Sequence, residues 1–216
     1  MADTERTVWL VRHGNRADFA DERWLLSAPR PHDPPLSPDG VVQAKETGRR
    51  LAAEPIDHVF ASPFLRAAET ACHIAEAIGL PVRIEHGLCE ALLTGWFPVE
   101  PDFISTAELA VRLPRIDLGY STAVTPQYPE TEADTLARTA RTIRSLIARW
   151  QGNLLLVSHG AAIHGLCSAL IEGRPHIHPA LCCLIKIVER DGRWTVERDG
   201  TDIAHLSSSE CNIRFM

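Results

Sequence analysis

The chain has 216 residues, which is long enough for one domain with a sizeable hydrophobic core. Its hydrophobic content of 45% and charged content of 23% are ordinary for a soluble globular protein. The formal net charge of −6 argues against a nucleic-acid partner, which would require a basic surface, but it leaves room for a local basic pocket that binds an anion.

The sequence contains no segment that indicates a membrane-bound or secreted protein. A run of about 18 apolar residues is missing, so we expect no membrane partner. The N-terminal residues lack a basic region followed by a long apolar run, which predicts a cytoplasmic location. The cysteines show no CxxC spacing, and we expect them to be reduced core residues; they are Cys72, Cys89, Cys167, Cys182, Cys183 and Cys211.

The first predicted strand is the apolar run at residues 7–11, which ends in Arg12-His13-Gly14. A cation and an imidazole at the end of a buried strand are typical of the ligand-binding edge of an α/β sheet. A connector at residues 28–38 contains five prolines, which exclude a helix there. Ser37 is the predicted N-cap of the next helix, which we expect to end near Ala53.

Two more strands and a helix follow in alternation. Residues 57–61 form a buried strand, a helix is expected from Pro63 to Ile78, and Gly79 is its predicted C-terminal cap. Residues 81–84 form a third short strand. This alternating order is typical of parallel strands joined by crossover helices.

Residues 85–130 break this order, since five prolines interrupt them. A connection of this length usually has a function of its own, so we expect a cap-like insertion with one short helix near residues 106–113. Regular structure resumes with a helix that begins at Thr131, where Asp134 has the spacing of a capping box.

The last part of the chain repeats the pattern of the first strand. An apolar strand at residues 154–158 ends in His159-Gly160 and is followed by a predicted helix at residues 161–172. Asp191-Gly192 is a strong signal for the turn of a C-terminal hairpin.

Two strands that both end in His-Gly predict a shared site. The carboxyl ends of parallel strands lie at one edge of a sheet, so His13 and His159 are expected to converge there. Arg12, Arg16 and Arg66 follow strand ends at the same edge. Guanidinium groups match phosphate oxygens in pairs of hydrogen bonds, so we expect a phosphate site.

Three motifs carry a resemblance to a known family. Leu10-Val11-Arg12-His13-Gly14, the helix start at residues 62–71 and Val157-Ser158-His159-Gly160 resemble the signatures of the histidine phosphatase superfamily, which includes the phosphoglycerate mutases. The resemblance implies an α/β fold, a three-layer α/β/α sandwich with a mostly parallel sheet. It also implies a single domain over residues 1–216 with the cap-like insertion at about 85–130.

The resemblance also implies roles for the site residues. His13 is the expected nucleophile, which becomes a phosphohistidine, while Arg12 and Arg66 clamp the phosphate and His159 stabilises its developing charge. Leu88-Cys89-Glu90 resembles the family's setting for the general acid, so Glu90 is the expected acid, with Glu85 as the alternative. This chemistry requires no metal and no cofactor.

Arg16 favours a phosphatase over a mutase. Mutases of the family have a serine where this chain has Arg16, whereas an arginine resembles the TULA and ecdysteroid-phosphate phosphatase domains, in which it implies a third phosphate ligand. The chain departs from that group at Ala91, where a tryptophan is expected. Two alternatives stay open: a phosphoglycerate-mutase-type phosphotransferase and a catalytically idle module that binds phospho-ligands.

Several further residues have competing interpretations. Ser62 is expected to cap a helix rather than to contact phosphate, and His164 to pack or face solvent. His176 and His178 lack a third ligand in the sequence, so no metal site is expected there; His178 or a neighbour could instead line the rim of the pocket. Trp96, Phe97, Phe103 and Tyr120 form either a leaving-group pocket or a small core of the insertion. The expected partner is a small phosphorylated substrate or a phosphoprotein, and a homodimer stays open.

Overall fold

The computed structural model describes residues 5–21, 23–173 and 175–207, and it contains one six-stranded sheet of order β3-β2-β4-β1-β5-β6. The first four strands in the chain pair in parallel, and the last two add an antiparallel hairpin. The strands are β1 (Arg6–Arg12), β2 (His58–Ala61), β3 (Val82–Ile84), β4 (Leu154–Ser158), β5 (Ile185–Arg190) and β6 (Arg193–Asp199). The mostly parallel sheet is therefore confirmed.

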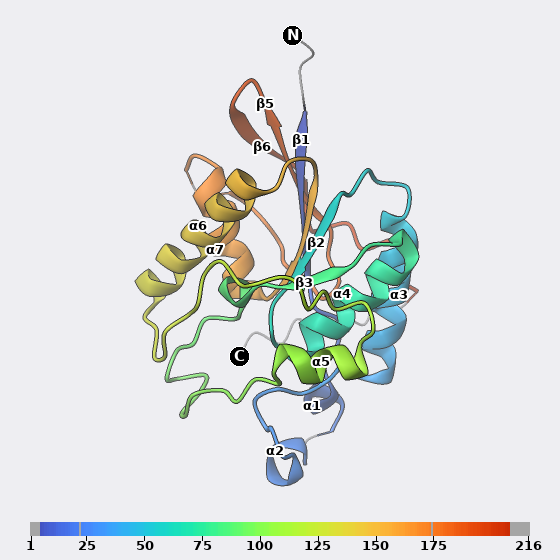
Figure 1. Cartoon of the computed structure of the whole chain (residues 1–216), viewed down its shortest axis with the longest axis vertical. Helices are drawn as coiled ribbons and strands as arrows, with labels where there is room; N and C mark the ends of the chain where they lie inside the picture. Colours follow the sequence, from blue (N-terminus) through green and yellow to red (C-terminus); the bar gives the residue numbers. More distant parts are fainter. Residues whose placement is uncertain (1–4, 22, 174, 208–216) are drawn as a thin grey trace.

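Helices cover both faces of this sheet, as Figure 1 shows. α3 (Pro38–Leu51) and α4 (Leu65–Ile78) pack together on one face, and α6 (Glu132–Arg149) and α7 (Gly160–Leu170) pack on the other. Because side chains alternate along a strand, Trp9 of β1 joins the core beneath α4, while the next residue, Leu10, joins the core beneath α7. The structure is a three-layer α/β/α sandwich.

The predicted helix and turn signals are present. The Ser37 side chain accepts a hydrogen bond from Gly40 N, and Thr131 and Asp134 form a capping box at the start of α6. Gly79 ends α4 with a φ of 77°, a left-handed conformation that glycine adopts without a steric cost. Asp191 and Gly192 both have positive φ, as a type I′ turn requires.

Two predicted helix boundaries are wrong. α4 begins at Leu65 rather than at Pro63, and its N-cap is Phe64, which makes no side-chain capping bond. Ser62 is therefore not the N-cap, and its hydroxyl is engaged elsewhere. The predicted helix at 161–172 is shorter at its end, since α7 finishes at Leu170. The short α1 (Ala17–Ala20), α2 (Trp24–Ser27) and η1 (His86–Leu88) were not predicted, because they are too short to show a helical period.

The irregular segment at residues 85–130 packs onto the main core. It contains η1 and α5 (Thr106–Arg112), which begins with a capping box between Ser105 and Glu108. Ile104, Leu109 and Ile116 join the hydrophobic cluster that includes the inner face of α4. Figure 1 shows α5 near the end of the molecule that also carries α1 and α2.

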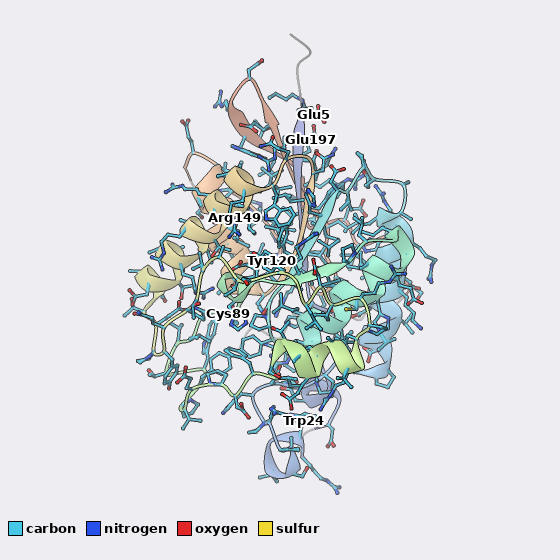
Figure 2. The ribbon with its side chains drawn as sticks, viewed as in Figure 1. Glu5, Trp24, Cys89, Tyr120, Arg149 and Glu197 are labelled. Atoms are coloured by element: carbon cyan, nitrogen blue, oxygen red, sulfur yellow. The ribbon has the colours of Figure 1, made fainter. Side chains whose placement is uncertain are left out.

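The two ends of the molecule are built differently. Figure 2 shows Trp24 of α2 at one end and Glu197 of the β5–β6 hairpin at the other.

In the described part of the chain, no helix combines the length and apolarity that crossing a membrane would need. Five cysteines are buried thiols, and burial raises the pKa of Cys72 and of Cys89 to about 12, so these two stay protonated. Cys211 lies outside the described residues.

A candidate active site at the carboxyl edge of the sheet

A cavity of about 320 Å³ opens at the carboxyl ends of the parallel strands. Five of the six predicted site residues line it: Arg12, His13, Arg16, Arg66 and Glu90. The sixth, His159, lies behind them, with its ring centroid 5.1 Å from that of His13. The predicted convergence of the two histidines is confirmed.

The sheet register brings the two histidines together. β1 and β4 are neighbours, and Arg12 pairs with Ser158 across them, so the next residue of each strand is a histidine at the same level. His13 N donates to Ser158 O at 3.0 Å, which continues the ladder by one more bond. Gly14 turns the chain away, and a Cβ there would lie 2.7 Å from the carbonyl oxygen of Gly40, so only glycine fits against the start of α3.

His13 is held as a neutral imidazole with one defined tautomer. Its side chain is buried, and its Nδ1 lies 2.8 Å from the carbonyl oxygen of Gly14. Because a carbonyl only accepts, Nδ1 carries the proton and Nε2 keeps the lone pair. Burial, together with the charges of Arg66 and Arg12, lowers the pKa of His13 well below its ordinary value. A neutral ring with a free lone pair is what a nitrogen nucleophile needs.

Arg12 and Arg66 have buried donors with no partner. Among the described residues, Arg12 Nε and both Nε and Nη1 of Arg66 are buried without a hydrogen bond. Leaving such donors unsatisfied is costly, and an anion in the cavity would satisfy them. Burial and the charge of Arg16 lower the pKa of Arg66 to about 9, so its guanidinium is still a cation at neutral pH.

Asp33 lies behind Arg66 and is a residue that the sequence analysis missed. Its Oδ1 lies 4.0 Å from Arg66 Nη1 and accepts a hydrogen bond from Leu65 N at 2.7 Å. Burial raises the pKa of Asp33 to about 6 despite the nearby guanidinium. The Asp33 carboxylate thus connects the proline-rich connector to the start of α4 by a hydrogen bond. At 4.0 Å it does not form a tight ion pair with the Arg66 guanidinium. No local pattern within the connector indicates this role.

Arg16 reaches the cavity but already has an acidic partner. Its Nε donates to Asp18 Oδ1 at 2.9 Å, its Nη2 donates to Asp18 Oδ2, and its guanidinium lies over the ring of Phe19. Two of its three nitrogens therefore face a carboxylate rather than the space between Arg12 and Arg66. Its role as a third phosphate ligand stays a prediction.

His159 is positioned by Ser62, which the sequence analysis assigned to a helix cap. His159 Nδ1 lies 3.3 Å from Arg66 Nη2, and its Nε2 lies 2.7 Å from Ser62 Oγ. Because a guanidinium only donates, Nδ1 is the acceptor and Nε2 carries the proton toward the serine. The interpretation of Ser62 as only a cap is wrong: its hydroxyl fixes the second histidine, and sequence alone could not show this contact across the sheet.

The two candidate acids have different surroundings. Glu85 is fully buried and accepts hydrogen bonds from five donors: Gly87 N, Tyr120 Oη, Thr122 Oγ1, Ala123 N and Val124 N. Its carboxylate therefore organises the irregular segment. Glu90 lines the cavity instead, with its Oε1 accepting from Ala91 N at 3.0 Å. The geometry favours Glu90 as the group that can reach a ligand.

Arg138 of α6 fixes the loop that carries Glu90. This buried guanidinium donates twice to Glu130, at 2.5 and 2.8 Å. Its remaining bonds reach backbone carbonyls of the loop: Gly87 O at 2.8 Å, Cys89 O at 3.0 Å and Glu90 O at 3.1 Å. All five N–H donors of the side chain are used. Arg138 and Glu130 were not predicted, because they look like ordinary charged surface residues in the sequence.

The outer wall of the cavity is largely apolar. Of the four aromatic residues singled out in the irregular segment, Trp96 and Phe97 line the cavity. Phe103 instead packs edge-on against Phe64, at a centroid distance of 4.9 Å, and Tyr120 packs against Phe60. His164 was expected to pack or face solvent; it is exposed to solvent and also lines the cavity. The rest of this outer wall comes from Phe19, Pro31, His32 and Pro179.

Comparison with known proteins shows a match to one family model and to several relatives. The family model described as "Histidine phosphatase superfamily (branch 1)" matches residues 8–201. An ecdysteroid-phosphate phosphatase of Drosophila melanogaster is 27% identical over 93% of this chain, but the match covers only 33% of that protein. This chain therefore spans about a third of that relative.

Two further similarities cover nearly whole chains. A probable phosphoglycerate mutase of Yersinia enterocolitica, GpmB, is 30% identical over 92% of this chain and 94% of its own length. The crystal structure of an ecdysone phosphate phosphatase from Bombix mori, in complex with tungstate, superposes with a TM-score of 0.71. That structure is 24% identical and covers 88% of this chain and 91% of its own, which shows a shared fold.

Proposed function

This chain belongs to the histidine phosphatase superfamily, and from the geometry of its cavity we propose that it is a metal-independent phosphomonoesterase that acts through a phosphohistidine at His13. One observation carries the proposal. A neutral imidazole with its lone pair on Nε2 stands beside buried guanidinium donors that have no partner among the described residues. Such an arrangement combines a nucleophile with stabilisation of an anion.

In the proposed first step, the phosphate oxygens of the substrate bind to Arg12 and Arg66. His13 Nε2 attacks phosphorus, a P–N bond forms, and the bond from phosphorus to the ester oxygen breaks. Glu90 in its acid form gives a proton to the departing oxygen. In the second step the Glu90 carboxylate takes a proton from water, the water oxygen attacks phosphorus, and the P–N bond breaks to release orthophosphate.

His159 is proposed to stabilise the transferred phosphoryl group. Burial and the charge of Arg66 lower its pKa well below the ordinary value in this structure. A bound phosphate dianion would counter both effects and would draw the Arg66 Nη2 donor away from Nδ1, so that Nδ1 can take up a proton and donate to a phosphoryl oxygen. Nε2 stays on Ser62, so the serine keeps the ring in the orientation that this donation needs.

Ser62→Ala is expected to lower kcat about tenfold, a fraction of the 10²–10⁴-fold that a positioned acid or base contributes. The reason is that the His159 ring loses its partner on Nε2 and samples other orientations. The measurement is kcat against pH for aryl phosphate hydrolysis, since a change in the titration of His159 alters the shape of the profile. Thr47→Val removes another fully buried hydroxyl, in α3, and serves as the matched control. Equal profiles for Ser62→Ala and Thr47→Val would contradict the role of Ser62.

A mutase activity is the second candidate function, because the GpmB relative is a probable phosphoglycerate mutase. Arg16 argues against it, since the mutases of the family resemble one another in having a serine there. We expect the chain to release orthophosphate from an aryl phosphate in the presence of excess chelator. We also expect orthophosphate release from phosphoglycerate to exceed its isomerisation.

The same assay separates the alternatives. Isomerisation faster than orthophosphate release would establish the mutase. Loss of activity on chelation would contradict the metal-independent mechanism. Binding of orthophosphate without turnover of any ester would indicate an idle phospho-ligand module.

The outer wall indicates the kind of leaving group. Phe19, Trp96 and Phe97 offer apolar surface beyond the phosphate end of the cavity. We propose that the substrate is a phosphomonoester whose leaving group carries apolar surface, and that residues 85–130 act as the cap that contacts it. The Drosophila relative is named for ecdysteroid phosphates, a substrate class consistent with such a wall.

A further inference from the structure

Two histidines and an aspartate meet outside the active-site cavity. His176 and His178 lie between α7 and β5, and Asp199 is the last residue of β6. One potential ligand atom of each residue lies within 4.8 Å of those of the other two. No third ligand is visible in the sequence, so no metal site was expected here, but the fold supplies that ligand from the hairpin strand.

The spacing of the two imidazoles fits a tetrahedral metal ion. His178 Nε2 and His176 Nδ1 lie 3.2 Å apart, and the two rings are tilted by 67° rather than stacked. Two nitrogens bound at 2.0–2.1 Å to a tetrahedral zinc ion lie about 3.3 Å apart. We propose that His176, His178 and Asp199 form a binding site for a divalent transition-metal ion of the zinc type, with solvent completing the coordination.

The chain on both sides of the site is held in place. His178 N donates to Asp199 O at 2.7 Å, which joins the histidine segment to the end of β6. Gly200 follows with a φ of 90°, and a Cβ there would lie 2.4 Å from His178 O, so the close approach depends on glycine. The site therefore does not rely on side chains alone for its shape.

The carboxylate of Asp199 is oriented as a ligand would need. Its Oδ1 accepts from Thr201 N at 3.0 Å and from Thr201 Oγ1 at 2.6 Å. Outer partners of this kind commonly orient metal ligands, and their loss weakens metal binding.

The ligand set selects the class of ion. Imidazole nitrogens suit zinc, copper, nickel and iron, whereas magnesium and calcium prefer oxygen ligands. A hydrogen bond between two neutral imidazoles would also explain the 3.2 Å contact between His176 and His178. Such a bond needs the lone pair of one ring nitrogen only, and it does not involve the Asp199 carboxylate. Metal binding requires all three side chains, so the effect of replacing Asp199 on Zn²⁺ affinity distinguishes the two explanations.

The site is a neighbour of the phosphate clamp but shares no residue with it. Pro179 follows His178, and its carbonyl oxygen accepts a hydrogen bond from Arg12 Nη1 at 3.0 Å. A metal ion here would therefore hold the segment that supports Arg12. The proposal does not depend on the proposed reaction, because binding is measurable without turnover.

The test is a titration of the metal-free full chain with Zn²⁺ against a chromophoric chelator. We expect one ion to bind per chain, and His178→Ala and Asp199→Asn each to lower the affinity at least about tenfold, the minimum effect that even an outer partner commonly has. His73→Ala removes a half-buried histidine elsewhere and is expected to bind Zn²⁺ as the unaltered chain does.

A further variant tests whether Zn²⁺ binds in the active-site cavity instead of at this site. His13→Ala should keep the affinity, because His13 lies in the other cluster. Unchanged affinity in both His178→Ala and Asp199→Asn, or loss of binding in His13→Ala, would overturn the proposal. If circular dichroism shows that either ligand variant is misfolded, His176→Ala provides the same test.

Discussion

His13→Ala is expected to lower kcat at least about 10³-fold, because it removes the proposed nucleophile. The imidazole of His13 combines a lone pair on Nε2 with a place on the cavity wall beside Arg12 and Arg66. The lone pair of His159 is directed to Arg66 instead, at 3.3 Å. Without His13 no covalent intermediate can form, and direct attack by water is a much harder step.

The measurement is kcat for an aryl phosphate, combined with trapping of labelled phosphate on the protein in an alkaline quench. His13→Ala should give no phosphohistidine, the label that is stable in alkali and lost in acid. Its affinity for orthophosphate should stay within a few fold of that of the unaltered chain, because both arginines remain. His164→Ala is a suitable control, since His164 also lines the cavity but takes no part in the proposed steps. Retention of more than a small fraction of turnover by His13→Ala would move the nucleophile to another residue.

Glu90→Gln is expected to separate substrates by their leaving groups. Alkyl phosphates, whose leaving oxygen needs a proton, should lose about 10²–10⁴-fold in kcat/KM, the range that a positioned general acid contributes. A nitrophenyl phosphate, whose leaving group departs as a stable anion, should lose far less in the first step. Glutamine keeps the size of the side chain and removes only the proton that can be transferred, so the comparison isolates proton donation.

Glu85→Gln provides the contrasting variant. Glu85 accepts five hydrogen bonds in the irregular segment, so its replacement should lower the thermal unfolding midpoint and affect both kinds of substrate alike. A ratio of alkyl to aryl hydrolysis that is the same in Glu90→Gln and the unaltered chain would remove Glu90 as the acid. A leaving-group dependence in Glu85→Gln would reassign the role to that residue.

The sequence predicted those features that depend on a few neighbouring residues. The caps at Ser37 and Thr131, the turn at Asp191-Gly192 and the apolar runs of the strands are encoded locally, and the structure contains them. The meeting of His13 and His159 also followed, since parallel strands place their carboxyl ends at one edge.

Contacts between distant parts of the chain could not be predicted in the same way. Arg138 binds Gly87 O from a position 51 residues further along the chain, and nothing near either residue specifies this bond. The partners Ser62–His159 and Arg66–Asp33 depend likewise on how connectors cross the sheet edge. The pairing of Arg16 with Asp18 is local, but the choice between a carboxylate and a phosphate oxygen depends on the shape of the cavity.

The two ends of the cavity are built from different kinds of structure. Its phosphate end rests on strand ends, the start of a helix and the fully bonded Arg138, whereas its outer wall comes mainly from Phe19, Pro31, His32, Trp96 and Phe97 on short or irregular segments. Substitutions in those segments disturb few backbone hydrogen bonds of the sheet and helices. New specificities can therefore arise by drift in the outer wall while phosphoryl transfer is preserved, and a mutagenesis library confined to these five positions is the economical route to an altered substrate range.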